Sequence, residues 1–356
     1  MSEYISRNYR GLPKKYWKYQ TFCWYIHDII LSLFHDCLAD DKLSTSVTFN
    51  NLTDAKEFEK SDDIIEWMYT NGYSNEANKI LGQRIFHSIL ADMMNFLFES
   101  LNTIEKGKIT VSLALLRKPM RDNLLYLEWL LGNPEEFINL VKNADIDKYA
   151  IEKLSADRKL IIIKKAIEQI DNKEFFDLMN ESMYFDLRYN KEAGNSLQKV
   201  WDKANHLVTT RKHNRSQEFN FVFLDEEIHI DFIDYYYKQV PHLLFYTYNI
   251  VLKLYERFIR KVEETSKIYN NSLIIFKFYD LSGKVKASDY FNNESKVLLN
   301  FICLDCNKVI PVKIKSKQFR AFRYGWSFEC PECQNEIITS KYVFLEDFKV
   351  ETNDTD

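Results

Sequence analysis

The chain reads ITVSLALLRKPMRDNLLYLEWLL over residues 109–131, and nearly every side of a helix built from these residues is apolar. The preceding stretch Asn75–Leu101 has the same character. Helices that are apolar all round are typical of a buried core. Glu105–Lys108 forms a short polar turn between the two stretches, so they are predicted to form an antiparallel helix pair. Pro119 interrupts the second stretch and is expected to kink it.

The composition extends this helical prediction to most of the chain. The 356 residues include only eight glycines and six prolines, whereas aromatic residues make up 15%. Few helix breakers and many large side chains favour long helices around a thick core. After residue 268 the pattern changes to short β-like runs separated by turn signals. We therefore expect a mainly α chain, with a multi-helix bundle domain over 1–268, a small β-rich domain over 269–350 and an acidic tail over 351–356.

Charge and hydropathy exclude several classes of protein. Charged residues make up 28% of the chain and nearly cancel, with a formal net charge of −4. This balance favours a folded globular protein over a disordered one. Because the net charge is not positive, any binding to nucleic acid would need a local basic patch. The longest uncharged apolar stretch, Val240–Leu252, has 13 residues, whereas a bilayer-spanning helix needs about 20. No secretory signal is visible near Met1, so we expect a cytoplasmic protein without a membrane partner.

Four of the six cysteines form two closely spaced pairs near the C-terminus. The spacing is Cys303-x2-Cys306, then 23 residues, then Cys330-x2-Cys333. Two such pairs supply the four thiolates of a tetrahedral zinc site. Because disulfides are rare in cytoplasmic proteins, metal binding is the first interpretation of these cysteines. Four thiolates leave no open coordination position, so we expect one structural Zn2+ per chain. Four unrelated thiols, a redox pair and an iron–sulfur cluster are the alternatives.

The cysteine-bearing segment resembles a zinc ribbon. Cys330–Cys333, with the sequence CPEC, is similar to the usual knuckle of that family, whereas the first knuckle lacks the proline. Zinc ribbons often place a glycine with positive φ after the second cysteine of a knuckle. Asn307 and Gln334 stand at these positions here, and asparagine tolerates that conformation better than glutamine. The resemblance implies a small zinc-ribbon-like β domain and leaves its partner open.

The residues between the two cysteine pairs are basic and aromatic. No acidic residue occurs between Asn307 and Phe328. Cations that contact phosphates and rings that stack on bases are the groups with which proteins bind single strands. We therefore predict that single-stranded nucleic acid, RNA included, is bound by Lys313, Lys315, Lys317, Arg320, Arg323 and Tyr324. The alternative is a solvated strand face whose aromatic residues pack the ribbon core, in which case the module docks a protein partner.

Several charged side chains lie among the apolar residues of the helix pair. Folding about the turn near Lys106 brings Asp92 close to position 120, within reach of Arg117 or Arg121. The two arginines are four residues apart and share a helix face. Buried charges are expensive unless they are paired, so the set predicts an internal ion-pair network. An anion-binding or catalytic cluster is the alternative. The set comprises Arg84, Asp92, Glu99, Arg117, Arg121 and Glu128.

A second polar cluster follows the helical segment 195–206. His206, Arg211 and His213 lie in one stretch with two threonines. Histidine, hydroxyl and arginine side chains together suit acid–base or phosphate chemistry. An ordinary polar loop is the alternative.

Leu115–Leu130, with the sequence LLRKPMRDNLLYLEWL, resembles uncharacterised bacterial helical proteins, some of them related to abortive-infection and HEPN-type helical domains. The resemblance covers about residues 80–260. HEPN ribonucleases carry an arginine followed four to six residues later by a histidine, and none of the seven histidines here has an arginine at that distance upstream. The resemblance therefore implies a nucleic-acid-binding or protein-interaction role in bacterial defence. The alternative is a ribonuclease-like helical effector enzyme that uses His206, Arg211 and His213 or the pair Arg117 and Arg121.

Overall fold

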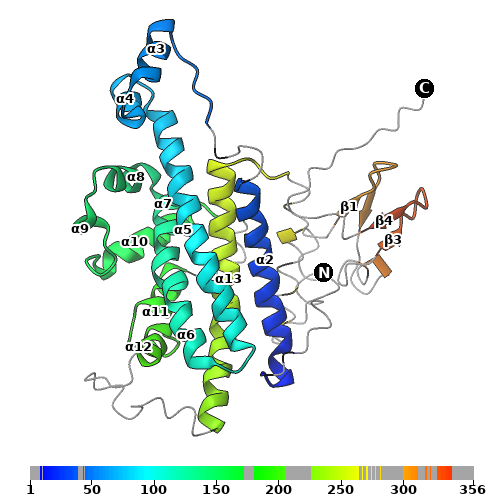
Figure 1. Cartoon of the computed structure of the whole chain (residues 1–356). Coiled ribbons are helices and arrows are strands. Elements are labelled where there is room, and N and C mark those ends of the chain that lie inside the picture. The colour runs from blue at the N-terminus through cyan, green and yellow to red at the C-terminus, as the bar shows by residue number, and fades with distance from the viewer. Residues whose placement is uncertain are drawn as a thin grey trace. The chain divides into compact units, whose positions relative to one another are not determined.

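The prediction of a mainly α-helical chain is confirmed (Figure 1). The computed structural model describes residues 9, 11–38, 43, 45–171, 180–205, 226–263, 300–311, 317, 318, 321 and 327–338, together with six single positions between 267 and 281. The contacts of the chain divide it into two compact units. The larger unit comprises Ile30–Lys261, and the smaller unit comprises Met1–Ile29 with Val262–Asp356.

An antiparallel helix pair forms the centre of the larger unit, as predicted. Its first arm is α5 (Ser74–Ile104). Its second arm consists of α6 (Ile109–Arg117), the π-helical turn η2 (Lys118–Asn123) and α7 (Leu124–Gly132). Ser100 and Ser112 lock the arms together near the turn, because each hydroxyl donates to the other residue's carbonyl oxygen, at 2.9 and 2.8 Å. Both serines are buried, so these bonds satisfy polar groups that would otherwise oppose the packing.

The π-helical turn η2 occurs where Pro119 predicted a kink. Proline has no amide hydrogen, and its ring clashes with the carbonyl group one α-helical turn earlier. A wider π turn is one way for a helix to accommodate such a residue. Within η2 the carbonyl oxygens of Met120 and Arg121 accept hydrogen bonds from the side chains of Arg188 and Tyr189. The turn is therefore tied to the C-terminal end of α11.

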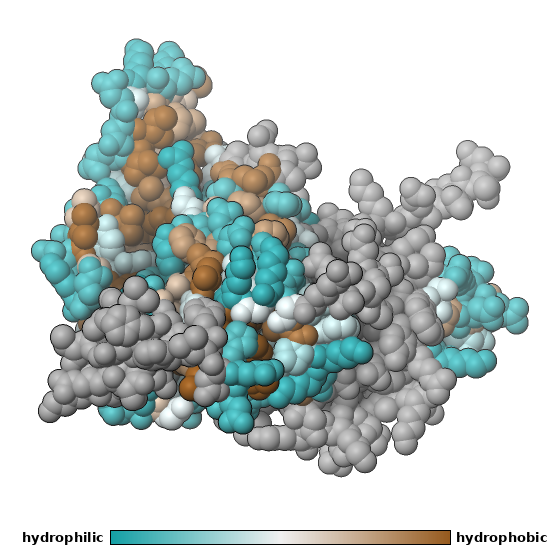
Figure 2. Space-filling view, turned by 60° about the horizontal axis from the view of Figure 1, so that its bottom comes forward, coloured by the Kyte–Doolittle hydropathy of each residue, from teal (hydrophilic) through white to brown (hydrophobic). Residues whose placement is uncertain are grey.

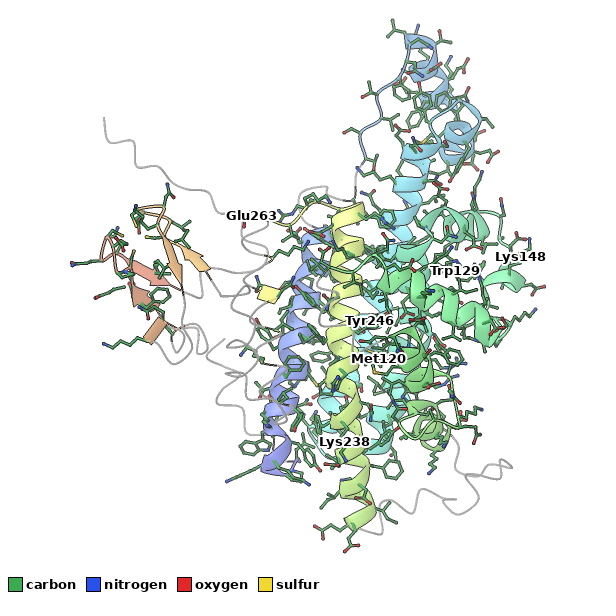
Figure 3. All side chains as sticks on the ribbon, turned by 180° about the vertical axis from the view of Figure 1, so that it is seen from behind. Met120, Trp129, Lys148, Lys238, Tyr246 and Glu263 are labelled. Carbon is green, nitrogen blue, oxygen red and sulfur yellow. The ribbon has the colours of Figure 1, made fainter. Side chains whose placement is uncertain are left out.

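A third long helix, α13 (Glu226–Phe258), packs against the pair. The contact with α5 is close: a Cβ atom added to Gly82 would lie 2.3 Å from the Phe258 ring. Gln83 donates to the Phe258 carbonyl oxygen at 2.8 Å. Figure 3 shows Tyr246 of α13 and Met120 of η2 among the side chains between the long helices. Both are fully buried, so the core of the larger unit lies between these helices.

Shorter helices surround this core. α3 (Leu52–Lys60) and α4 (Ile64–Thr70) lie at one end of α5, where Phe49, Phe58 and Trp67 pack around the buried Tyr73 (Figure 1). Five of the described helices, all between residues 134 and 205, follow the pair along the chain and flank its second arm. They are α8 (Pro134–Lys142), α9 (Ile146–Tyr149), α10 (Ala156–Ile167), α11 (Glu181–Arg188) and α12 (Leu197–Asn205).

The described part of the smaller unit combines an N-terminal helical segment with two β-hairpins. η1 (Lys14–Tyr16) leads into α2 (Trp17–Leu38), whose last residues belong to the larger unit. β1 (Asn300–Ile302) pairs antiparallel with β2 (Val309–Pro311), and β3 (Ser327–Glu329) with β4 (Glu336–Ile338). The tail expected over 351–356 lies outside the described residues.

Hydrophobic side chains reach the surface of the larger unit only in patches between hydrophilic ones on the face shown in Figure 2. None of the helices that the structure describes combines the length and the hydropathy that a membrane-spanning helix requires.

Candidate functional site

The first cysteine pair lies in a tight turn, or knuckle, between β1 and β2. The amide of Cys303 donates to the Lys308 carbonyl oxygen at 3.0 Å, and the amide of Asn307 donates to the Cys303 carbonyl oxygen at 2.8 Å. Asn307 has a φ of +55°. Asparagine adopts this left-handed conformation more readily than most residues. The turn is thus closed by local bonds that aim both thiols of the pair to one side.

The second knuckle, between β3 and β4, repeats this geometry 27 residues later. The amide of Cys330 donates to the Asn335 carbonyl oxygen at 2.8 Å, and the amide of Gln334 to the Cys330 carbonyl oxygen at 2.9 Å. Gln334 has a φ of +64°, as expected for its position after the second cysteine. Glutamine adopts this conformation less readily than asparagine. The two hairpins are therefore equivalent halves of one module.

The four sulfurs of Cys303, Cys306, Cys330 and Cys333 lie within 4.8 Å of one another. Those of Cys303 and Cys333 are 3.6 Å apart, and those of Cys306 and Cys330 are 3.7 Å apart. A tetrahedral site with zinc–sulfur bonds of about 2.3 Å has sulfur–sulfur edges of roughly 3.8 Å, whereas a disulfide would need about 2.05 Å. All four cysteines are free thiols. The cluster therefore has the geometry to hold one metal ion.

The closeness of the four sulfurs is reflected in their pKa values. Desolvation raises the pKa of Cys330, but hydrogen bonds from the backbone amides of Cys333 and Glu332 outweigh it and lower this pKa to about 7. A hydrogen bond from the Asn335 amide lowers the pKa of Cys333, but desolvation and the neighbouring sulfurs together outweigh it and raise this pKa to about 12. Four thiolates so close together need a cation between them, and tetrahedral sulfur sites take zinc or iron.

The cysteine cluster is closed on its inner side. Cys303 and Cys330 are buried, and Cys306 and Cys333 are half-buried. Ile310, Phe328 and Ile337 are buried apolar residues of the hairpins. A site with four sulfur ligands and an apolar backing suits a structural ion, because no coordination position is left for a substrate.

Most of the predicted nucleic-acid contacts lie outside the described residues. These are Lys313, Lys315, Arg320, Arg323 and Tyr324. Lys317 is described and is exposed, as is Lys308 beside the first knuckle. Binding through this segment stays a prediction.

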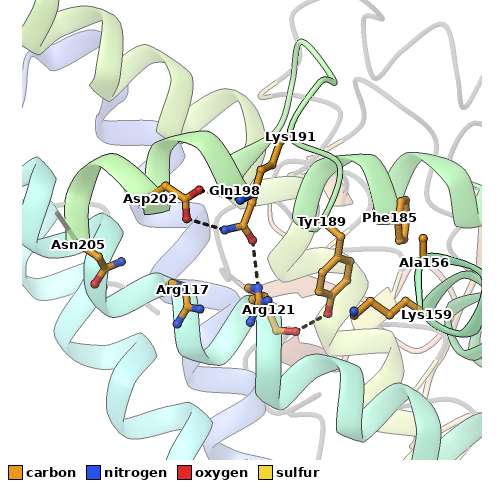
Figure 4. Close-up of a pocket in the computed structure, with 10 residues that line it drawn as sticks. All are labelled: Arg117, Arg121, Ala156, Lys159, Phe185, Tyr189, Lys191, Gln198, Asp202 and Asn205. Atoms are coloured by element: carbon orange, nitrogen blue, oxygen red, sulfur yellow. Dashed lines mark hydrogen bonds and ion pairs between the residues drawn. The ribbon is translucent and has the colours of Figure 1, made fainter. Parts of the chain in front are cut away.

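A polar pocket of about 620 Å3 opens on the larger unit between η2, α10, α11 and α12 (Figure 4). Arg121 lies at its middle, with Arg117 and Asn205 toward one end and Lys159 and Phe185 toward the other. The remaining lining residues are Ala156, Tyr189, Lys191, Gln198 and Asp202. The structure thus brings the predicted pair Arg117 and Arg121 together in one hollow.

Hydrogen bonds hold the centre of this pocket in place. The Nε of Arg121 donates to Gln198 Oε1 at 3.0 Å, and Gln198 Nε2 donates to Asp202 at 2.8 Å. Asp202 also pairs with Lys191 at 3.2 Å. The Tyr189 hydroxyl donates to the Arg121 carbonyl oxygen. The links from α12 orient the Arg121 guanidinium, and Tyr189, at the end of α11, holds the Arg121 backbone.

The end of the pocket that contains Lys159 and Phe185 is positively charged. Burial, and after it the nearby Arg121 charge, lower the pKa of Lys159, while Asp122 and Glu152 oppose this change. Lys159 donates to the Leu154 carbonyl oxygen at 2.5 Å and is only 9% exposed. The pocket therefore contains a partly desolvated cation that faces another cation.

The internal ion-pair network differs from the expected one. Asp92 does lie near position 120, but it pairs with Lys118 at 2.7 Å and accepts a bond from Asn123, also at 2.7 Å, so neither arginine is its partner. Arg121 pairs instead with the adjacent Asp122, at 2.5 Å. Folding the two stretches about the turn correctly predicted which part of the second arm lies opposite Asp92. The two arginines, however, face a different side of that arm.

The buried pair of the larger unit is Glu128 with Arg188. Both side chains have no exposed surface, and Arg188 Nη2 lies 2.6 and 2.9 Å from the two carboxylate oxygens. The Tyr246 hydroxyl donates to the same carboxylate at 2.6 Å. Glu128 belonged to the expected network, whereas its partner lies 60 residues later on α11 and gave no local signal.

His206, Arg211 and His213 lie outside the described residues. The last described residue before them is Asn205, which lines the polar pocket. Sequence reasoning did not identify Lys159, Lys191, Gln198 or Asp202 as site residues. Gln198 and Asp202 are four apart on a strongly amphipathic helix, which was the one available signal.

No protein-family model matches this chain, and no curated protein or solved structure is significantly similar to it. Its function is therefore inferred from the chemistry of its own side chains.

Proposed function

We propose that this chain is a zinc-containing nucleic-acid-binding protein in which the metal centre fastens both ends of a basic, aromatic segment. The observation that carries the proposal is the cluster of four cysteine sulfurs within 4.8 Å of one another. Its knuckles enclose the segment between Cys306 and Cys330. Zinc suits four thiolates, has no redox chemistry and commonly stabilises small β modules that lack a sufficient core of their own.

The enclosed segment has the composition of a single-strand-binding surface. Residues 308–326 contain six lysines and arginines, four aromatic residues and no acid, in a chain whose net charge is −4. Fastening both ends of such a segment lowers the conformational entropy that binding has to remove. The exposed Lys308 and Lys317 are the described members of this set.

Salt dependence of binding tests the phosphate contacts. Replacing Lys313, Lys315 and Lys317 with alanine removes up to three cations. Each phosphate contact to a single strand contributes about 0.7 to the slope of log affinity against log salt, so the slope should fall by about 2. Tyr324→Ala should weaken binding with little change in this slope, because stacking releases no counterions. Fluorescence anisotropy with a labelled single-stranded RNA measures both quantities.

The matched control changes three exposed lysines of the larger unit, Lys148, Lys153 and Lys164, to alanine. It carries the same change in net charge and should keep the wild-type slope. Absence of binding to single-stranded RNA and DNA even at low salt would end the nucleic-acid proposal and leave protein docking as the role of the module.

Elemental analysis tests the metal separately. The purified protein should contain about one zinc per chain. Cys330→Ser should release the ion and lower RNA affinity together, because the segment loses one of its fastened ends. A metal-free wild type whose four thiols react freely would contradict the zinc assignment without bearing on RNA binding.

A ribonuclease-like effector enzyme of bacterial defence is the second candidate function. The position of Arg117 and Arg121 in one pocket, with Asn205 at its edge directly before His206, favours it. RNA that is shortened by the wild type but not by His206→Ala or Arg211→Ala would support this function. RNA that is bound and stays intact over long incubation would argue against it.

A further inference from the structure

The polar pocket of the larger unit has no part in the roles proposed above for the metal module, which comprises residues 300–338. We propose that it is a binding site for the phosphate group of a small organic phosphate. Of the described residues that line it, four carry positive charge, namely Arg117, Arg121, Lys159 and Lys191.

The cations of the pocket outnumber the acids beside it. Asp202 lines the pocket and pairs with Lys191, and Asp122 pairs with Arg121. Glu152 also acts on Lys159, so the four cations and these three acids leave an excess of one positive charge. Helix pairs usually bury such charge only when it is compensated. A dianionic phosphate would supply this compensation at the surface where the pocket opens.

Hydrogen-bond donors remain available inside the hollow. Among the described residues, the Arg117 guanidinium has Asp122 as its acidic neighbour, at 3.9 Å, which is beyond hydrogen-bonding distance. Arg121 uses Nε for Gln198 and Nη1 for Asp122, which leaves its Nη2 without a described partner. Two guanidinium groups four residues apart on one helical arm form a fork that suits phosphate oxygens.

The arrangement of Arg121 resembles a prepared site more than a chance surface cluster. Its side chain is 18% exposed, and its guanidinium is held by Gln198, which is itself held by Asp202 (Figure 4). Ordering a side chain in advance lowers the entropy lost on binding. Lys159, which faces Arg121, would gain an opposite charge from the ligand, and its lowered pKa would then rise.

The size and lining of the pocket indicate what accompanies the phosphate. A volume of about 620 Å3 is within the range of small-molecule sites and leaves room beyond a phosphate group. The amides of Gln198 and Asn205 offer hydrogen bonds to a polar group, and Phe185 offers an apolar surface. A sugar phosphate or a nucleotide fits this lining.

Calorimetric titration of the full chain with adenosine monophosphate, ribose 5-phosphate, inorganic phosphate and adenosine tests the proposal. The three phosphate-bearing probes should bind and adenosine should not. Tighter binding of adenosine monophosphate than of ribose 5-phosphate would identify a nucleotide site, and the reverse order would identify a sugar phosphate site.

Arg117→Gln should weaken the best phosphate-bearing probe by about tenfold or more, because a charge-assisted contact is lost. The half-exposed Arg117 makes no hydrogen bond with a described residue, so the variant should keep the thermal stability of the wild type. Lys164→Gln, an exposed residue of α10 outside the pocket, removes the same charge and should bind like the wild type. No binding of any phosphate probe, equal binding of adenosine, or equal weakening by both variants would overturn the proposal. Loss of RNA binding to the metal module would leave these outcomes unchanged.

Discussion

Replacing Arg188 with methionine should destabilise the larger unit by about 3–5 kcal/mol. Methionine keeps much of the length of the side chain but removes the charge. Glu128 then stays fully buried with the Tyr246 hydroxyl as its described hydrogen-bond donor, at 2.6 Å. The cost comes from the carboxylate left without its cation and not from lost packing. The carbonyl oxygens of Tyr184 and Met120 also lose a donor, at 3.2 and 3.5 Å.

The pH dependence of this loss carries a definite sign. Burial raises the pKa of Glu128, and Arg188 and Tyr246 oppose that rise. Without Arg188 the folded-state pKa rises further, whereas the unfolded-state pKa stays at about 4.3. Between these two values the folded variant holds a proton that the unfolded chain has lost, so its stability falls as the pH rises. The deficit relative to the wild type should be smaller at about pH 5 than at about pH 8.

Urea unfolding followed by circular dichroism measures these differences, since the helices of the larger unit dominate the signal. Arg158→Met is the matched control, because Arg158 pairs with Glu136 at 2.5 Å where both side chains are about one-third exposed. It should cost no more than about 1 kcal/mol. Adding Glu128→Leu to Arg188→Met removes both charges and should recover part of the loss. A deficit no larger than that of the control, or one that is the same at both pH values, would refute this account of the buried pair.

Three further changes test separate contacts. Gly132→Ala should destabilise the larger unit by about 1–3 kcal/mol, measured by urea unfolding, because the added Cβ would lie 2.9 Å from the backbone nitrogen of Ala166 and would force α7 and α10 apart; an unchanged midpoint would contradict this close packing. Tyr246→Phe should cost about 1.5–3 kcal/mol in the same assay, since the bond to the Glu128 carboxylate is charge-assisted, and a loss below that of an exposed tyrosine would show that the bond is not formed. Cys330→Ser should abolish metal binding in elemental analysis but leave the main thermal transition of the larger unit in place, because the metal module folds with its ion; loss of that transition would mean that the two units unfold together.

The sequence predicted those features that local periodicity and spacing determine. The helix pair follows from two all-apolar helical stretches and a polar turn, and α5, α6 and α7 occupy the expected residues. The cluster of four cysteines that could hold a metal ion follows from their spacing, and Asn307 has the positive φ expected at its position. Both patterns lie within short segments, so they can be recognised from one sequence alone.

The features that could not be predicted depend on which side of a helix faces which neighbour. An α-helix turns by about 100° per residue, so an error of one position changes the partner of a side chain. Lys118 and not Arg117 therefore reaches Asp92. The partner of Glu128 comes from a separate helix, and the lining of the polar pocket comes from several elements between Arg117 and Asn205. No repeat or spacing in the sequence indicates which of these separate helices come into contact.

The π-helical turn at Lys118–Asn123 gives the helix arm a tolerance to a change in length that its composition does not suggest. A π turn is equivalent to one residue inserted into an α-helix. Deleting one residue there would convert the arm to continuous α-helix and leave α6 and α7 close to their present orientation, because the wider turn already absorbs the extra residue. A deletion in the regular part of α7 would instead rotate the residues on either side of it by about 100° against each other. A chain shortened by one residue within the π turn should therefore keep both Glu128 beside Arg188 and Arg117 in the polar pocket.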